Sequence, residues 1–125
     1  MSQRTNEADL AAVMETVHAY YDGMVAADEA KLGRAFHPRA SIVGNEVGEL
    51  SWSTLDEFVA ECKQAVAQAG PHEWRVEALS FVGDIALVRL GGQFAAAWYT
   101  DDLSLIRIDG AWRIVHKTFY AHPGT

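Results

Sequence analysis

The 125-residue sequence contains a single cysteine, Cys62, so an internal disulfide is excluded. Because Cys62 lies within an apolar helical pattern, we interpret it as a buried, unreactive thiol. The polar N-terminus has no apolar signal core, and no apolar run approaches the roughly 20 residues that span a membrane. We therefore expect a cytoplasmic protein that does not associate with membranes.

Positive charge is also scarce. Ten Lys and Arg residues stand against 17 Asp and Glu residues, which gives a formal net charge of -7 at pH 7. This balance disfavours nucleic acid as a partner, because nucleic-acid binding relies on clustered basic side chains. The length and the hydrophobic content of 50% are those of one domain, residues 1–125, with a substantial core.

Motifs for metal, phosphate and nucleophile sites are missing. The five histidines are scattered, and no pair has the spacing of metal ligands on one helix. Gly91-Gly92-Gln93 lacks the spacing of a phosphate-binding loop, and no nucleophile elbow is present. We expect neither a metal nor a cofactor.

Two β-hairpins in the last third of the chain are the strongest local signal. Gly83-Asp84 and Asp109-Gly110 each separate two apolar runs, and these residue types accept the positive φ angles of tight hairpin turns. Small residues at Gly91-Gly92 and 95–97 predict a bulge or turn between the middle strands. The expected long strands are 73–82, 85–93, 97–108 and 111–120.

The first half of the chain predicts helices. A 3.6-residue apolar stripe covers residues 10–25 after a cap at Thr5 or Asn6, and a shorter helix covers 28–36 before Pro38. A third helix follows a cap at Ser53 or Thr54 and ends at Gly70-Pro71. Short strands are expected at 41–43 and 49–52. Helices followed by antiparallel strands favour an α+β fold over a doubly wound one.

This order of elements, together with four stretches of sequence, resembles the nuclear transport factor 2-like superfamily. The stretches are residues 17–23, 36–42, 82–86 and 99–119. The chain is most similar to the branch named "putative lumazine-binding" and close to the polyketide cyclase (SnoaL-like) branch. The resemblance implies a cone-shaped fold in which three N-terminal helices pack in the concave face of a strongly bent, mostly antiparallel sheet. It also implies a pocket inside the cone and a homodimer formed through the sheet face.

Asp101, Asp102 and Lys117 lie on the two arms of the last hairpin. A two-residue turn places Asp102 opposite Lys117, whereas a three-residue turn places Asp101 there. Such a pair is either a surface ion pair worth about 0.2–1 kcal/mol or a charged couple inside the pocket. The resemblance implies that Asp101 is the acid–base residue, since the polyketide cyclase branch uses a late-strand aspartate.

His116 alternates with Trp112 and Ile114, so we expect it on their face, the inner one. There it would assist Asp101, or serve as a hydrogen-bonded core residue. Tyr20 or Tyr21 should point into the concave side, where a hydroxyl needs a partner. The early strand 41–43 contains no acid, so the ketosteroid isomerase site is not reproduced.

The remaining candidate ligand contacts are mostly aromatic, as is usual for small-molecule pockets. They are Tyr20, His37, Trp52, Phe58, Trp98 and Lys117. Core packing and a dimer interface are the alternative roles for the tryptophans, and a helix-end cap is the alternative role for His37.

Three functions remain open. The first is a protein that binds a small hydrophobic or aromatic molecule in an aromatic-lined pocket. The second is a cofactor-independent lyase, isomerase or cyclase that uses Asp101 on a cyclic or polyketide-like substrate. The third is an assembly module that dimerises through its sheet.

Overall fold

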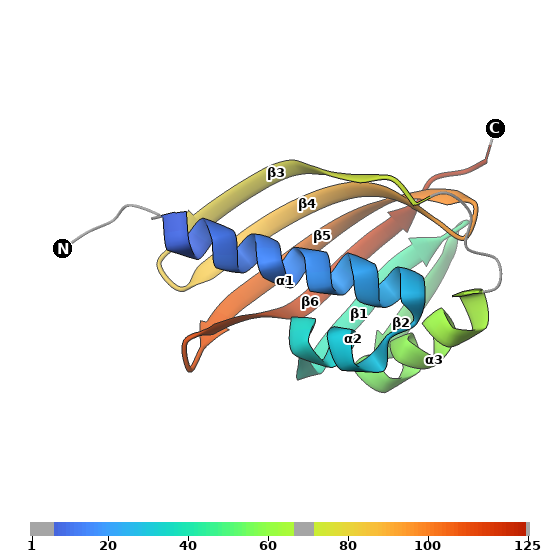
Figure 1. The fold of residues 1–125 in the computed structure, drawn as a ribbon. Helices are drawn as coiled ribbons and strands as arrows, with labels where there is room; N and C mark the ends of the chain where they lie inside the picture. The colour runs from blue at the N-terminus through green and yellow to red at the C-terminus, as the bar shows by residue number, and fades with distance from the viewer. Residues whose placement is uncertain (1–6, 67–71, 125) are drawn as a thin grey trace.

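The computed structural model describes residues 7–66 and 72–124. Three helices pack against one curved sheet of six strands, which confirms the α+β fold (Figure 1). The elements are α1 (Glu7–Ala26), α2 (Glu29–Ala35), β1 (Phe36–Glu46), β2 (Glu49–Thr54), α3 (Leu55–Ala65), β3 (Trp74–Val82), β4 (Ile85–Phe94), β5 (Ala97–Ile108) and β6 (Ala111–Ala121). In this part of the chain, no helix has the length and apolar character needed to cross a membrane.

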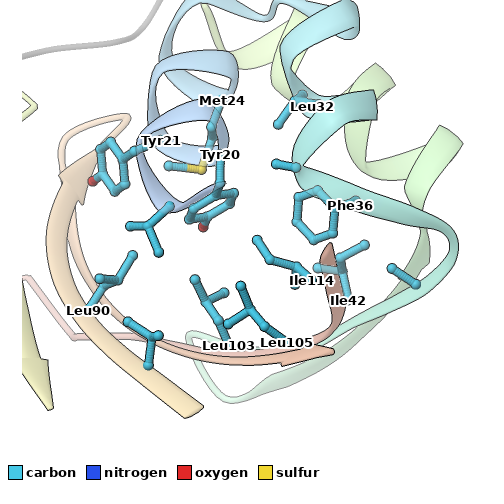
Figure 2. Close-up of a cluster of buried hydrophobic side chains, with 14 of the residues drawn as sticks. Tyr20, Tyr21, Met24, Leu32, Phe36, Ile42, Leu90, Leu103, Leu105 and Ile114 are labelled. Carbon is cyan, nitrogen blue, oxygen red and sulfur yellow. The ribbon is translucent and has the colours of Figure 1, made fainter. Parts of the chain in front are cut away.

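The sheet has the strand order β2-β1-β6-β5-β4-β3. β1 and β6 run parallel, and all other neighbours are antiparallel. Helix α1 lies across the concave face, with α2 and α3 beside the β1–β2 end (Figure 1). The core fills the space between α1, α2 and this face, and Figure 2 shows Leu90, Leu103 and Leu105 on the curved strands below Tyr20.

The two expected hairpin turns are confirmed. Asp109 and Gly110 have φ angles of 51° and 81°, and Gly83 has a φ of 56°. The turn between β4 and β5 is formed by Ala95 and Ala96, whose φ angles are also positive at 51° and 68°.

The expected turn between the middle strands is thus confirmed at 95–96, whereas Gly91 and Gly92 lie within β4 and do not belong to it. A Cβ atom on Gly92 would overlap the hydroxyl of Tyr21, so this glycine lets α1 approach the strand. The small residues therefore have two separate roles, a turn at 95–96 and close packing at 91–92.

The second helix and the first strand meet earlier than expected. Helix α2 begins after its cap at Asp28, as expected, but ends at Ala35, and β1 starts at Phe36. The strand is longer than expected because it pairs with β2 on one side and β6 on the other. Thr54 forms a capping box with Glu57 at the start of α3. The expected cap at Thr5 or Asn6 and the stop at Gly70-Pro71 lie outside the described residues.

A β-bulge in β6 changes the register of the last hairpin. Near the turn, Leu105 pairs with Ile114, as a two-residue turn requires, but Ser104 pairs with His116. Val115 is thus an extra residue on β6, and from there on the partners shift by one. Leu103 lies opposite Lys117, Asp102 opposite Thr118 and Asp101 opposite Phe119, so both expected aspartate–lysine pairings are wrong.

Candidate functional site

A cavity of about 300 Å³ opens between α1, α3 and the inner face of the sheet. Its apolar walls come from Tyr21, Met24, Phe58, Phe94, Tyr99 and Phe119. Its polar lining is Glu46, Ser51, Glu61, Asp101 and Lys117. Apolar walls with a few converging polar groups are typical of small-molecule sites.

Asp101 is the buried acid of the cavity, with 4% of its surface exposed. The Tyr20 hydroxyl donates a hydrogen bond of 2.5 Å to its Oδ2 atom, while its buried Oδ1 atom has no hydrogen-bond partner among the described residues. Burial, together with the charge of Asp101 and this bond, raises the pKa of Tyr20 well above its usual value. Tyr20 therefore stays protonated and holds one carboxylate oxygen of a residue that lines the cavity.

Lys117 is the buried base of the same cavity and is also 4% exposed. Its Nζ atom lies 4.4 Å from the ring centroid of Phe58, 5.0 Å from that of Tyr20 and 5.1 Å from that of Phe119. Three rings at these distances stabilise a positive charge. No carboxylate of the described residues lies within the 4.0 Å of an ion pair with Lys117. The Lys117 ammonium is thus surrounded by aromatic rings and forms no ion pair with a carboxylate of the described residues.

Asp101 and Lys117 reach the cavity from adjacent strands. Asp101, Leu103 and Leu105 alternate along β5 and are buried on the inner face. On β6, Ile114 is buried on the same face, and the extra residue at Val115 makes Lys117 the next inward side chain. Tyr20 bridges the two, because its hydroxyl binds Asp101 and its ring faces Lys117. Figure 2 shows the Tyr20 side chain descending from α1 with its hydroxyl toward the sheet.

His116 lies on the outer face of the sheet, so the expectation that it faces inward is wrong. Its Nδ1 atom is 2.7 Å from the hydroxyl of Ser41, and its Nε2 atom is 2.9 Å from that of Thr118. The bulge is the reason, since the alternation that links His116 to Ile114 is broken at Val115. His116 and Asp101 therefore do not converge.

Asp102 also lies on the outer face. Its two carboxylate oxygens accept hydrogen bonds of 2.7 and 2.9 Å from Arg89 on β4. These bonds lower the pKa of Asp102 against the opposing effect of partial burial. Asp102 thus belongs to a surface ion pair, and Asp101 is the aspartate in the cavity.

The expected aromatic contacts are only partly in the cavity. Phe58 lines it, whereas Trp52 is 69% exposed and Trp98 lies under the guanidinium of Arg75, 5.0 Å from its ring centroid. Neither tryptophan belongs to the lining, which corrects the expectation that they form the pocket walls. His37 is also outside it, and its Nδ1 atom accepts a hydrogen bond from the backbone of Arg39.

Several lining residues were missed from the sequence. Tyr99 and Phe119 lie two positions from Asp101 and Lys117 along their strands, and this alternation could have identified them. Glu61 lies three residues after Phe58 on α3, so helical spacing could have placed both on one face. Nothing in the sequence around Glu46 marks it as a cavity residue.

The cavity mouth carries further polar contacts. The Tyr99 hydroxyl donates to Glu46 at 3.1 Å, and the Ser53 hydroxyl donates to Glu61 at 3.0 Å. Cys62 lines the wall as a buried free thiol, and burial raises its pKa to about 11. Among the described residues, no group of three or more His, Cys, Asp or Glu side chains is arranged to hold a metal ion.

Comparison with known proteins gives one curated relative and several solved structures. The curated relative is Aldolase FrzH from Cladobotryum sp., which is 23% identical over 125 residues that cover 98% of this chain and 99% of the relative. An NTF2-like protein of unknown function from Silicibacter pomeroyi is 32% identical, with a TM-score of 0.88 over 95% of this chain and 100% of that one. A ketosteroid isomerase-like protein from Erwinia carotovora atroseptica shares the fold, with 16% identity and a TM-score of 0.73 over 96% of this chain and 100% of that one.

A family model described as "Putative lumazine-binding" matches residues 8–120, which reach from the second residue of α1 to the last but one of β6 and include the whole cavity lining. The chain therefore belongs to this family, within the nuclear transport factor 2-like superfamily.

Proposed function

We propose that the cavity binds a small, largely apolar carbonyl compound and that Asp101 exchanges a proton with the carbon next to its carbonyl group. The observation that carries this proposal is the buried Asp101 carboxylate, which has one oxygen fixed by Tyr20 and the other unpaired in the cavity. A positioned carboxylate with a free oxygen is suited to general base catalysis.

The neighbouring Lys117 stabilises the anion that this proton transfer produces. Asp101 takes a proton from the α-carbon, and the electron pair of the broken C–H bond moves to the carbonyl oxygen as an enolate. The Lys117 ammonium, held by three aromatic rings in the same cavity, stabilises that developing negative charge. Return of the proton from Asp101 to the same carbon gives exchange, and its return to another carbon of a conjugated enolate gives isomerisation. Attack of the enolate carbon on a second carbonyl forms a C–C bond and an alkoxide, which takes the proton from Asp101 to complete an aldol addition.

The relatives support this class of reaction. One is named an aldolase and another a ketosteroid isomerase-like protein, and both names denote chemistry through enolates. His116 was expected to assist Asp101, whereas here that role falls to Lys117, which lines the cavity, and to Tyr20, which is buried behind the lining and binds Asp101.

Deuterium exchange provides the test. Acetophenone and cyclohexanone are incubated with the protein in D2O, and loss of the α-proton signal is followed by ¹H NMR. We expect exchange above the rate in buffer, reduced by about 100-fold or more in Asp101→Asn. Asp102→Asn, the same change on the outer face, should retain the wild-type rate. Exchange that survives Asp101→Asn contradicts the proposal.

Ligand binding without turnover is the second candidate, favoured by the mainly apolar cavity walls and the description of the family. Native mass spectrometry of the purified protein distinguishes the two. A retained molecule at one per subunit, together with no proton exchange on any ketone, would support a binding protein.

We also propose a homodimer formed through the outer face of the sheet. Trp52 and Leu87 are exposed there, at 69% and 54%, and both lie outside the cavity. Sedimentation equilibrium tests this proposal, and Leu87→Asp should shift a dimer toward monomer. A monomeric wild-type protein contradicts it.

A further inference from the structure

The charges in the cavity are unequal and are arranged by depth. Three carboxylates line it, those of Glu46, Glu61 and Asp101, against the single ammonium of Lys117. Asp101 and Lys117 are buried at the inner end, whereas Glu46 and Glu61 are exposed at the mouth. The inner charges offset one another, so the excess negative charge lies where a ligand enters.

The mouth also provides aromatic surface beside these acids. The Tyr99 hydroxyl donates to Glu46, and the rings of Tyr99 and Phe119 are adjacent, with centroids 6.0 Å apart. Glu61 lies on the α3 side, where the Ser53 hydroxyl fixes one of its oxygens. Carboxylates next to aromatic rings are the usual surroundings of a bound ammonium group.

The Asp101 carboxylate at the buried end of the cavity indicates that a ligand binds there. Asp101 lines the cavity and is more than nine-tenths buried, and its Oδ1 atom has no hydrogen-bond partner in the part of the chain that the structure describes. An unpaired buried acceptor is costly unless a donor reaches it. The acids at the mouth and the unpaired acceptor inside therefore belong to one site.

We propose that the substrate is an amine-bearing carbonyl compound whose ammonium group lies at the mouth, between Glu46 and Glu61, while its carbonyl end reaches Asp101 and Lys117. This inference rests on the proposed function for the carbonyl end and adds the charge of the opposite end. Lys117 repels a second cation, which orients the molecule with its amine outward.

A matched pair of probes tests the charge preference. 4-(Aminomethyl)acetophenone and 4-(hydroxymethyl)acetophenone have the same ring and the same ketone, and differ in carrying an ammonium or a neutral hydroxyl at the far end. We expect the amine to bind about threefold to tenfold more tightly at low salt, since each exposed carboxylate contributes modestly. The preference should shrink at high salt because the acids at the mouth are accessible to ions.

Substitution of glutamate by the neutral isostere glutamine tests which residues cause the preference for the amine probe. Glu46→Gln and Glu61→Gln keep the acceptors for Tyr99 and Ser53 and remove only the charges. The double variant should bind both probes equally. Glu15→Gln, which removes the same charge from an exposed site on α1 that does not line the cavity, should keep the preference.

The outcomes separate this inference from the proposed function. Equal binding of the two probes to the wild-type protein, or a preference that survives in the double variant, overturns the amine site alone. Failure of both probes to bind overturns the amine site and the carbonyl site together. Asp101→Asn should leave the charge preference intact while it reduces proton exchange by about 100-fold or more.

Discussion

Asp101 and Asp102 are neighbours in β5, yet they lie on opposite faces of the sheet and in different surroundings. Asp102 is on the outer face, and Arg89 binds both of its oxygens. Asp101 is on the inner face, bound on one side by the neutral hydroxyl of Tyr20 and unpaired on the other. Both carboxylate oxygens of the outer aspartate accept hydrogen bonds from the protein, whereas we propose that a ligand binds the second oxygen of the inner one.

The difference shows that strand alternation, rather than residue type, separates surface chemistry from cavity chemistry. The basic residues Arg89 and Lys117 are divided between the two faces in the same way. Arg89 forms an ion pair on the outer face, while Lys117 on the inner face is in contact with aromatic rings and no carboxylate within ion-pairing distance in the described structure. Groups that a protein leaves unsatisfied inside a cavity are those that act on ligands.

Of the substitutions below, Lys117→Met should have the largest effect, because it removes the positive charge from the inner end of the cavity. Enolate stabilisation is lost, so proton exchange on acetophenone should fall by about 10²–10³-fold. Stability should be unchanged or higher, because an apolar side chain of similar length replaces a buried charge. NMR exchange and urea unfolding measure the two quantities. Lys63→Met on the exposed part of α3 is the control, and a loss of stability without loss of exchange would contradict the account.

Shortening a side chain on each face of β5 tests which residues of this strand face the core. Leu103 is fully buried opposite Lys117, so Leu103→Ala should lower the free energy of unfolding by about 2–5 kcal/mol. Its neighbour Ser104 lies on the outer face, and Ser104→Ala should stay within about 0.5 kcal/mol of wild type. Urea denaturation measures both variants. Similar losses at the two positions would show that the assigned faces are wrong.

A smaller effect is expected from Tyr20→Phe, which removes the one hydrogen bond to the Asp101 carboxylate found among the described residues. The free energy of unfolding should fall by about 1–3 kcal/mol, because the buried carboxylate is left without a partner. Tyr99→Phe, which loses a bond to the exposed Glu46, should change it by less than about 0.5 kcal/mol. Equal losses in thermal or urea unfolding would indicate that Asp101 is not held by Tyr20.

The smallest effect concerns the outer ion pair and depends on pH. The pKa of Asp102 is lowered in the folded protein by Arg89, so the pair stabilises the fold above the unfolded-state pKa of about 3.9. That contribution is lost as the pH falls through the lower, folded-state pKa. Urea unfolding from pH 7 to pH 2 should show wild type slightly more stable than Asp102→Asn near neutrality and equal to it in acid. A difference that grows in acid would contradict the assignment.

The turns and the fold were predictable from local signals. Asp109-Gly110 and Gly83-Asp84 fix their hairpins because few residue types accept positive φ, and the capping residues Asp28 and Thr54 are recognisable in the same way. These features depend only on residues close together in the chain, and they establish the order of the elements.

The composition of the site was harder to predict, because it depends on one extra residue. Val115 is an ordinary β-strand residue, and nothing nearby marks it as a bulge. Without the bulge, alternation from Ile114 places His116 inside and Lys117 outside, the reverse of what the structure shows. Asp101 was singled out by the family resemblance, and the apolar stripe of α1 pointed to Tyr20 or Tyr21, so neither inference used that register.

A crystal structure of the protein grown with acetophenone tests the central claim most directly. The account predicts the ketone inside the cavity, with its oxygen within hydrogen-bonding distance of Lys117 Nζ and its methyl carbon next to Asp101 Oδ1. A ketone bound on the outer face, or bound inside with its carbonyl group away from both residues, would contradict it.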